Sequence, residues 1–125
     1  MSTQWVVLKY GGTSVAGRPQ WAAVAARLHS HLSQGHRVLL VCSAVTGITN
    51  ALADLANDSE SEEKLAAVLV RHRKLAADLG VPDADWIGPA ESALREAARA
   101  LAKGAGFEGQ AELLAMGEWM STRIG

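Results

Sequence analysis

Apolar positions in the first fifty residues predict two strands, each followed by a turn and a helix. The run Trp5–Leu8 predicts a buried strand that ends at Lys9. Apolar side chains then recur at helical spacing, which predicts a helix that begins near Pro19 and ends at Gly35. The continuous apolar run Val38–Cys42 predicts a second strand that is covered on both faces. Because about thirty residues separate the strands, we expect them to be parallel.

The pattern beyond the second strand is helical almost throughout. Two strands are too few for a self-sufficient parallel sheet, so the sequence predicts an incomplete α/β fold with a helix-rich second half, the beginning of a larger domain. The predicted helices span residues 50–56, 65–79, about 89–103 and about 110–124. A flexible break is predicted between the last two, at Gly104, Gly106 and Gly109.

Size, composition and charge narrow the class of protein. The chain has 125 residues, is 49% apolar and carries a net charge of −1. These values fit one globular domain and argue against a general nucleic-acid or membrane-surface binder. Residues 1–50 carry four basic and no acidic side chains, whereas residues 51–125 carry eight basic and thirteen acidic ones. An acid-free half suits an anionic ligand, although acids gathered on helix surfaces would explain the same segregation.

Cysteine content and the absence of long apolar stretches indicate the compartment. The single cysteine, Cys42, lies in an apolar run, which predicts a small buried side chain in a reducing environment. The N-terminal apolar run is too short for a signal peptide, and no stretch approaches the ~18 apolar residues of a membrane span. The sequence therefore predicts a cytoplasmic protein.

The first turn carries the side chains that a polyphosphate site needs. Gly11 and Gly12 allow backbone conformations in which several N–H groups face one concavity. Lys9 adds a mobile ammonium group, and Thr13 and Ser14 add hydroxyl donors. A simple turn between strand and helix explains the glycines equally well, because their spacing matches neither the Walker A nor the dinucleotide-binding pattern.

A second polar turn and one isolated acid complete the candidate chemistry. The turn runs from Ser43 to Asn50, and parallel strands bring it to the same sheet edge as the first turn, where ligands of open α/β sheets bind. Thr49 and Asn50 could instead cap the next helix. Glu118 is flanked by glycine and apolar residues, so it either receives an ammonium group or is an exposed helix acid.

Three segments, in this order, resemble the aspartokinases, a branch of the amino acid kinase family. KYGGTSV at 9–15 resembles the opening signature of that family, VCSAVTGITNAL at 41–52 its second turn, and MGEWMST at 116–122 its glycine–glutamate segment. The resemblance implies a three-layer α/β/α fold, of which residues 1–125 would be the N-terminal portion of the catalytic domain. Tyr10 stands where phenylalanine is common in the family.

The resemblance also implies a reaction and roles for individual residues. The γ-phosphoryl group of ATP would pass to the side-chain carboxylate of L-aspartate and give 4-phospho-L-aspartate, the first step toward lysine, threonine, methionine and diaminopimelate. Mg²⁺ would be held mainly by ATP and by residues outside this chain. The implied roles are charge stabilisation and phosphate contact for Lys9, phosphate binding for Gly11, Gly12, Thr13 and Ser14, and aspartate binding for Ser43, Thr49 and Glu118.

The resemblance implies limits as well. The family's catalytic domain extends well beyond 125 residues, so this chain alone is expected to be weak or inactive, and the full-length protein is expected to be a homo-oligomer without nucleic-acid or membrane partners. Two alternatives remain open. The chain could belong to a kinase for another small acid, or it could be a non-catalytic module that binds a small anion or associates with a kinase subunit.

Overall fold

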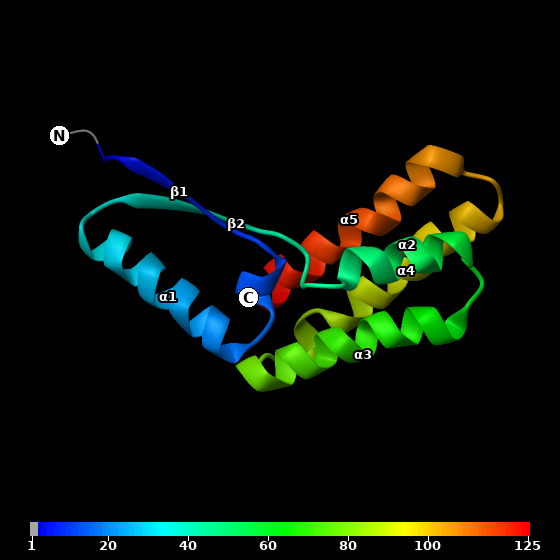
Figure 1. The fold of residues 1–125 in the computed structure, drawn as a ribbon, viewed down its shortest axis with the longest axis horizontal. Helices are drawn as coiled ribbons and strands as arrows, with labels where there is room; N and C mark the ends of the chain where they lie inside the picture. Colours follow the sequence, from blue (N-terminus) through cyan, green and yellow to red (C-terminus); the bar gives the residue numbers. More distant parts are fainter. Residues whose placement is uncertain (1–2) are drawn as a thin grey trace.

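The computed structural model describes residues 3–125 and contains one small sheet beside a group of helices (Figure 1). The sheet, the first helix and the first turn form one end of an elongated molecule, and the helices that follow the second strand form the other. In chain order the elements are β1 (Trp5–Tyr10), the 3₁₀ turn η1 (Gly12–Val15), α1 (Arg18–Ser33), β2 (Arg37–Cys42), α2 (Ile48–Asn57), α3 (Glu62–Leu79), the 3₁₀ turn η2 (Asp83–Asp85), α4 (Ile87–Ala102) and α5 (Gly106–Ile124).

The two strands pair in parallel, as the sequence predicts. Trp5 lies opposite Arg37 and Tyr10 lies opposite Cys42, so both strands end at the same level. The helix α1 between them begins with Pro19 in its first turn and is followed by Gly35 in a left-handed conformation. The connection therefore delivers the turns after β1 and β2 to one edge of the sheet.

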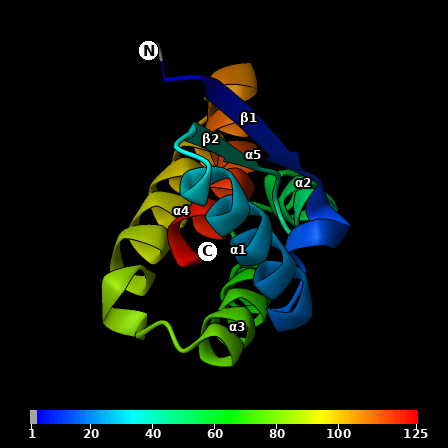
Figure 2. The ribbon, with the colours of Figure 1, turned by 90° about the vertical axis from the view of Figure 1, so that its left-hand side faces the viewer.

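Only one face of this sheet is covered, which corrects the prediction of a strand covered on both sides. Helix α1 covers one face of the sheet, as Figure 2 shows. Leu40 packs against the core on this face, and Leu8, its partner on β1, is half-buried. On the opposite face Val7 is 64% exposed and Leu39 is 52% exposed. A continuous apolar run predicts cover on both faces because it carries no alternation, but this chain supplies no element for the second face within residues 3–125.

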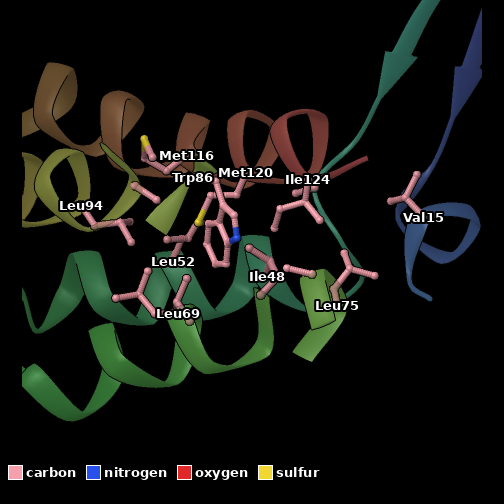
Figure 3. Packing of buried hydrophobic residues seen from close by; sticks show 14 of the residues in the cluster. Val15, Ile48, Leu52, Leu69, Leu75, Trp86, Leu94, Met116, Met120 and Ile124 are labelled. Carbon is pink, nitrogen blue, oxygen red and sulfur yellow. The ribbon is translucent and has the colours of Figure 1, made fainter. Parts of the chain in front are cut away.

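The helical end of the molecule holds most of the apolar core. Trp86 is fully buried between the helices, with Leu52 and Met120 close by in Figure 3. Leu94 from α4 and Leu113 from α5 are also fully buried, so all four helices of this group contribute to one cluster. Among residues 3–125, no helix combines the length and the apolar character that crossing a bilayer requires.

Element boundaries differ from the predicted ones mainly at glycines. Helix α5 begins at Gly106, not near residue 110, and Gly109 is a buried residue inside the helix. A Cβ on Gly109 would lie 3.2 Å from Leu101 Cγ, so this glycine allows α5 to approach the end of α4 closely. The predicted flexible break is therefore confined to the residues around Gly104, because a glycine in sequence signals either flexibility or close packing.

Candidate functional site: two turns and the last helix

The turns after β1 and β2 are in direct contact at the carboxyl edge of the sheet. The N–H of Ser43 donates to the carbonyl of Tyr10 at 2.9 Å, which extends the strand pairing by one residue. The N–H of Thr46 donates to the carbonyl of Gly12 at 3.3 Å. The two segments that the sequence predicts to share one edge therefore form a single bonded unit.

Gly12 is required for that contact, although for a reason that differs from the predicted one. A Cβ at this position would lie 2.8 Å from the carbonyl oxygen of Ala44 and 3.1 Å from the backbone nitrogen of Thr46. Neither Gly11 nor Gly12 has a positive φ, so neither uses the left-handed conformation that glycine allows. Gly11 is exposed, with open space around its Cα, and a ligand can approach the backbone at this point.

The first turn continues directly into the 3₁₀ turn η1. The N–H of Ser14 donates to the carbonyl of Gly11 at 3.0 Å, which closes this turn. Gly12 and Thr13 stand at its N-terminal end, where a helical turn offers their N–H groups no internal acceptor. Thr13 is exposed and Ser14 is partly exposed, so both hydroxyl groups remain accessible beside those N–H groups.

The second turn leads into α2 through a left-handed glycine. Gly47 has φ = +82° and occupies the N-cap position, so the prediction that Thr49 or Asn50 caps this helix is wrong. Both residues instead lie exposed in the first helical turn, where N–H groups and the helix dipole favour an anion. Thr49 is thereby free of the capping role that the sequence left open.

Helix α5 is tied to the second turn by a buried hydroxyl group. Ser121 Oγ lies 2.7 Å from the carbonyl oxygen of Ser43, to which it donates, and 3.2 Å from the carbonyl oxygen of Glu118. The backbones of Ser43 and Glu118 therefore meet at one hydroxyl, although 75 positions separate them in the sequence. Ser121 is fully buried, so this bond is shielded from water.

Gly117 permits this close approach of α5. A Cβ on Gly117 would lie 2.7 Å from the Cβ of Ala44 and 3.4 Å from side-chain atoms of Ile48 and Leu52. The next residue, Glu118, is exposed. The glycine of the third sequence segment thus seats the helix against the second turn, and the carboxylate beside it remains accessible.

The structure links the backbones that carry all the predicted side chains. Lys9 is exposed on the open face of the sheet, one position before the residue that bonds Ser43. The cavity beside the turns, about 230 Å³ in volume, is lined by residues such as Ala16, Val45 and Ile48 and does not include Lys9, Ser43 or Glu118. The predicted side chains therefore lie around a shared edge, not inside a closed pocket.

Two residues that hold the second turn were not singled out in the sequence. Ser121 has a recognisable position, because it follows Gly117 by one helical turn on the buried side of α5. Arg71 of α3 donates from Nη2 to the carbonyl of Thr46 at 2.6 Å. No sequence pattern marks Arg71, because it lies on the exposed side of an amphipathic helix among other charged residues.

Metal and thiol chemistry find no support among residues 3–125. No group of three or more histidine, cysteine, aspartate or glutamate side chains in this part of the chain is arranged to hold a metal ion. Cys42 is buried at the end of β2, and burial raises the pKa of its thiol, which disfavours the nucleophilic thiolate. The ammonium of Lys9 and the N–H groups at the start of η1 present positive charge at this edge of the sheet.

Comparison with known proteins agrees with this arrangement. The sequence model of the amino acid kinase family matches residues 4–124. The aspartokinase of Rickettsia felis is 34% identical over 56 residues, and that of Rickettsia conorii is 32% identical over 56 residues. Each of these matches covers 45% of this chain and 14% of the relative, so the chain corresponds to a small part of those enzymes.

Solved structures extend the similarity to nearly the whole chain. Escherichia coli aspartokinase III in complex with lysine and aspartate gives a TM-score of 0.75 at 30% identity, covering 98% of this chain and 28% of that one. The same enzyme with aspartate and ADP gives a TM-score of 0.71 at 27% identity, covering 97% and 27%. The two strands and the helix-rich second half thus have the arrangement of an incomplete α/β kinase fold. The chain belongs to the amino acid kinase family, and within it resembles the N-terminal part of the aspartokinases.

Proposed function

We propose that this chain forms the phosphate- and aspartate-binding part of an aspartokinase, an enzyme that moves the γ-phosphoryl group of ATP to the side-chain carboxylate of L-aspartate. The observation that carries the proposal is the junction of the two turns with α5. The N–H of Ser43 donates to Tyr10 at the end of β1, and the carbonyl of Ser43 accepts from Ser121 of α5. The three sequence segments therefore meet at Ser43. A related enzyme of this fold has been solved with aspartate and ADP.

The first turn is the proposed phosphate site. Lys9 would contact the phosphates of ATP and offset the negative charge that develops on the group in transfer. Gly11 and Gly12 would let the phosphates approach the backbone, and Thr13 and Ser14 would donate hydrogen bonds. The open space at Gly11 and the exposure of Thr13 support this assignment.

The second turn and Glu118 form the proposed aspartate site. Ser43 and Thr49 would hold the substrate carboxylate and the group in transfer, and the Glu118 carboxylate would bind the substrate ammonium. The exposure of Thr49 and Glu118 supports these roles, since each is open to solvent and adjacent to the fixed second turn.

The chemistry requires positioning more than covalent help from the protein. A carboxylate is already ionised at pH 7, so the nucleophile needs no general base. Two anions must be held in line for transfer, and fixed donors do this at low cost when they are organised beforehand. Mg²⁺ would be held mainly by ATP and by residues outside this chain, and it would supply positive charge to the phosphates.

The remaining features of the proposal concern the complete protein. The chain spans 28% of a related solved enzyme, so the base and ribose of ATP would be bound by segments outside it, and residues 1–125 alone would turn over weakly or not at all. We further propose a cytoplasmic, homo-oligomeric enzyme at the first step of the pathway to lysine, threonine, methionine and diaminopimelate.

A hydroxylamine-trapping assay with L-aspartate and MgATP tests the proposal. The chain would be joined to the remaining catalytic segment of Escherichia coli aspartokinase III, and aspartyl hydroxamate would be measured. We expect Lys9→Met to lower kcat by about a hundredfold and Glu118→Gln to raise the KM for aspartate by about tenfold. The controls are Lys103→Met and Glu112→Gln, which alter exposed side chains at the C-cap of α4 and on α5, away from the turns.

The same assay separates the alternatives. Hydroxamate formation from glutamate or another small acid, but not from aspartate, would indicate a kinase of different specificity. A fused protein that folds and makes no hydroxamate with any acid, while the isolated chain self-associates in gel filtration without ATP, would support the non-catalytic module. Wild-type rates in both the Lys9 and the Glu118 variants would contradict the site assignment.

A further inference from the structure

Arg71 of α3 makes a further contact with the second turn. Its guanidinium group donates from Nη2 to the carbonyl oxygen of Thr46 at 2.6 Å, across 25 positions of sequence. A hydrogen bond from a charged donor is stronger than a neutral one, and this bond is short. The turn is thereby fixed at Thr46 by Arg71, at Ser43 by Ser121, and at its contact with the first turn by Gly12.

Contacts at Gly47 show how closely the guanidinium group packs on the turn. A Cβ on Gly47 would lie 3.0 Å from Nη1 of Arg71, and the backbone φ there is +82°. Gly47 thus satisfies both the left-handed conformation and the approach of the arginine. Gly47 is the N-cap of α2, the helix that carries Thr49. The guanidinium group of Arg71 therefore also positions the start of this helix.

Arg71 has a different kind of partner from two other arginines of the helical region. Arg73 on the same helix pairs with Asp83, and Arg95 on α4 pairs with Glu62 and Glu91. Within residues 3–125, no carboxylate lies within 4 Å of the Arg71 guanidinium. Its contact is instead with a backbone carbonyl in the turn.

Helix α3 provides a rigid base for this contact. The residues next to Arg71 on the inner side of the helix, His72 and Leu75, are buried against the core. The backbone of α3 at this point is therefore fixed by packing, whereas the guanidinium group reaches outward to the turn. Removing the guanidinium group takes away a surface contact and leaves no cavity in the core.

We propose that Arg71 is a positioning residue that fixes the turn Thr46–Gly47 and, through the start of α2, places Thr49 for aspartate binding. The second half of this statement rests on the proposed function, and the first half does not. Arg71 itself touches neither of the residues proposed to hold the substrate carboxylate, so its removal would act through the geometry of the turn.

Hydrogen exchange of single amides, followed by NMR on the full chain, tests the first half. The N–H of Thr46 donates to Gly12 of the first turn, and the N–H of Ile48 donates to Val45 within the second turn. We expect Arg71→Met to speed their exchange about tenfold, and Arg71→Lys, which retains one charged donor, to speed it about threefold. The N–H of Ser43, bonded to Tyr10, serves as an internal reference and should exchange at an unchanged rate.

Arg73→Met is the matched control, because it removes an exposed arginine of the same helix that does not touch the turn. Equal exchange rates at Thr46 and Ile48 in wild type and Arg71→Met would overturn the proposal. So would equally faster exchange in Arg71→Met and Arg73→Met, since this would indicate a general loosening of α3.

Calorimetric titration with L-aspartate, and separately with MgATP, tests the second half. We expect Arg71→Met to weaken aspartate binding about tenfold and MgATP binding less than twofold, with Arg71→Lys restoring part of the aspartate affinity. Unchanged aspartate affinity in a variant with a loosened turn would overturn the link to Thr49. If the wild-type chain alone binds neither ligand, the same titration is made on its fusion to the remaining catalytic segment. Absence of binding there would contradict the proposed function, and the exchange rates alone would then decide whether Arg71 fixes the turn.

Discussion

The α/β region (residues 5–42) and the helical region (residues 48–124) bury their apolar side chains to very different extents. The α/β region contributes only Val15, Trp21, Val24 and Cys42 to the buried core. The helical region contributes nearly all the rest, from Ile48 to Ile124, and packs helix against helix around Trp86. Stability therefore comes mainly from one region, whereas most of the candidate chemistry lies at the end of the other.

At the junction of the two regions, the well-packed helices contact the segment that carries candidate chemistry. Gly117 and Ser121 of α5 contact the second turn directly, so a well-packed helix fixes a segment that has little core of its own. Arg71 of α3 does the same from another side. The second turn is therefore held by the helical region as well as by the small sheet from which it emerges.

The largest difference between the regions should appear when one leucine from each is truncated. Leu52→Ala removes a fully buried side chain from the helical core and is expected to lower the free energy of unfolding by about 2–5 kcal/mol. Leu39→Ala on the open face of the sheet should change it by no more than about 0.5 kcal/mol, since the side chain is already half exposed. Urea unfolding followed by circular dichroism measures both, and equal losses would contradict the comparison.

A smaller effect is expected at the junction. Gly117→Ala places a methyl group against Ala44, and the resulting overpacking should cost about 1–3 kcal/mol. Gly88→Ala in α4 is the control, because a Cβ there meets no atom within 4 Å and alanine favours the helix by up to about 1 kcal/mol. Thermal unfolding of the two variants would show opposite shifts, and a stabilised Gly117 variant would mean that α5 does not seat against the turn.

The smallest effect concerns the buried imidazole of the helical region. His72 Nδ1 lies 2.8 Å from the carbonyl oxygen of Val68 and donates to it, which leaves Nε2 as an acceptor with no partner among residues 3–125. Burial lowers the pKa of His72 below its usual value of 6.5, because a charged ring would lose its hydration.

The unfolded chain consequently binds a proton at His72 more readily than the folded one. The contribution of His72 to the free energy of unfolding should be fully present above pH 6.5 and should be lost as the pH falls below that value. The slope from this one group is at most about 1.4 kcal/mol per pH unit. Urea unfolding at several pH values measures the slope. His72→Leu should flatten it and His29→Gln, an exposed substitution, should not; an unchanged slope in His72→Leu would assign it to other groups.

Much of the fold was accessible from sequence because its patterns are local. The apolar runs, Pro19 and Gly35 placed both strands and α1, and the parallel pairing followed from the length of the connection. The open face of the sheet was not predicted, because an uninterrupted apolar run does not reveal whether its cover belongs to the same chain. The start of α5 was missed because Gly109 is a packing glycine, and close packing depends on a partner distant in sequence.

The candidate site divides in the same way. The two turns and Glu118 were identified by residue type and by resemblance, and the structure brings their backbones together through Ser43 and Ser121. Arg71 could not be found, because its bond to Thr46 depends on how α3 packs against α2. The roles of Lys9, Thr49 and Glu118 as individual side chains stay predictions, which the hydroxamate assay addresses.

The hydrogen bond from Ser121 to Ser43 joins positions 78 residues apart, and this separation bears on the order of folding. Closing so long a loop costs conformational entropy before the contact contributes anything. We expect the helices to collapse first around their shared core, with the second turn taking its final shape when α5 docks. During synthesis, both glycine turns would leave the ribosome long before the helix that completes their geometry.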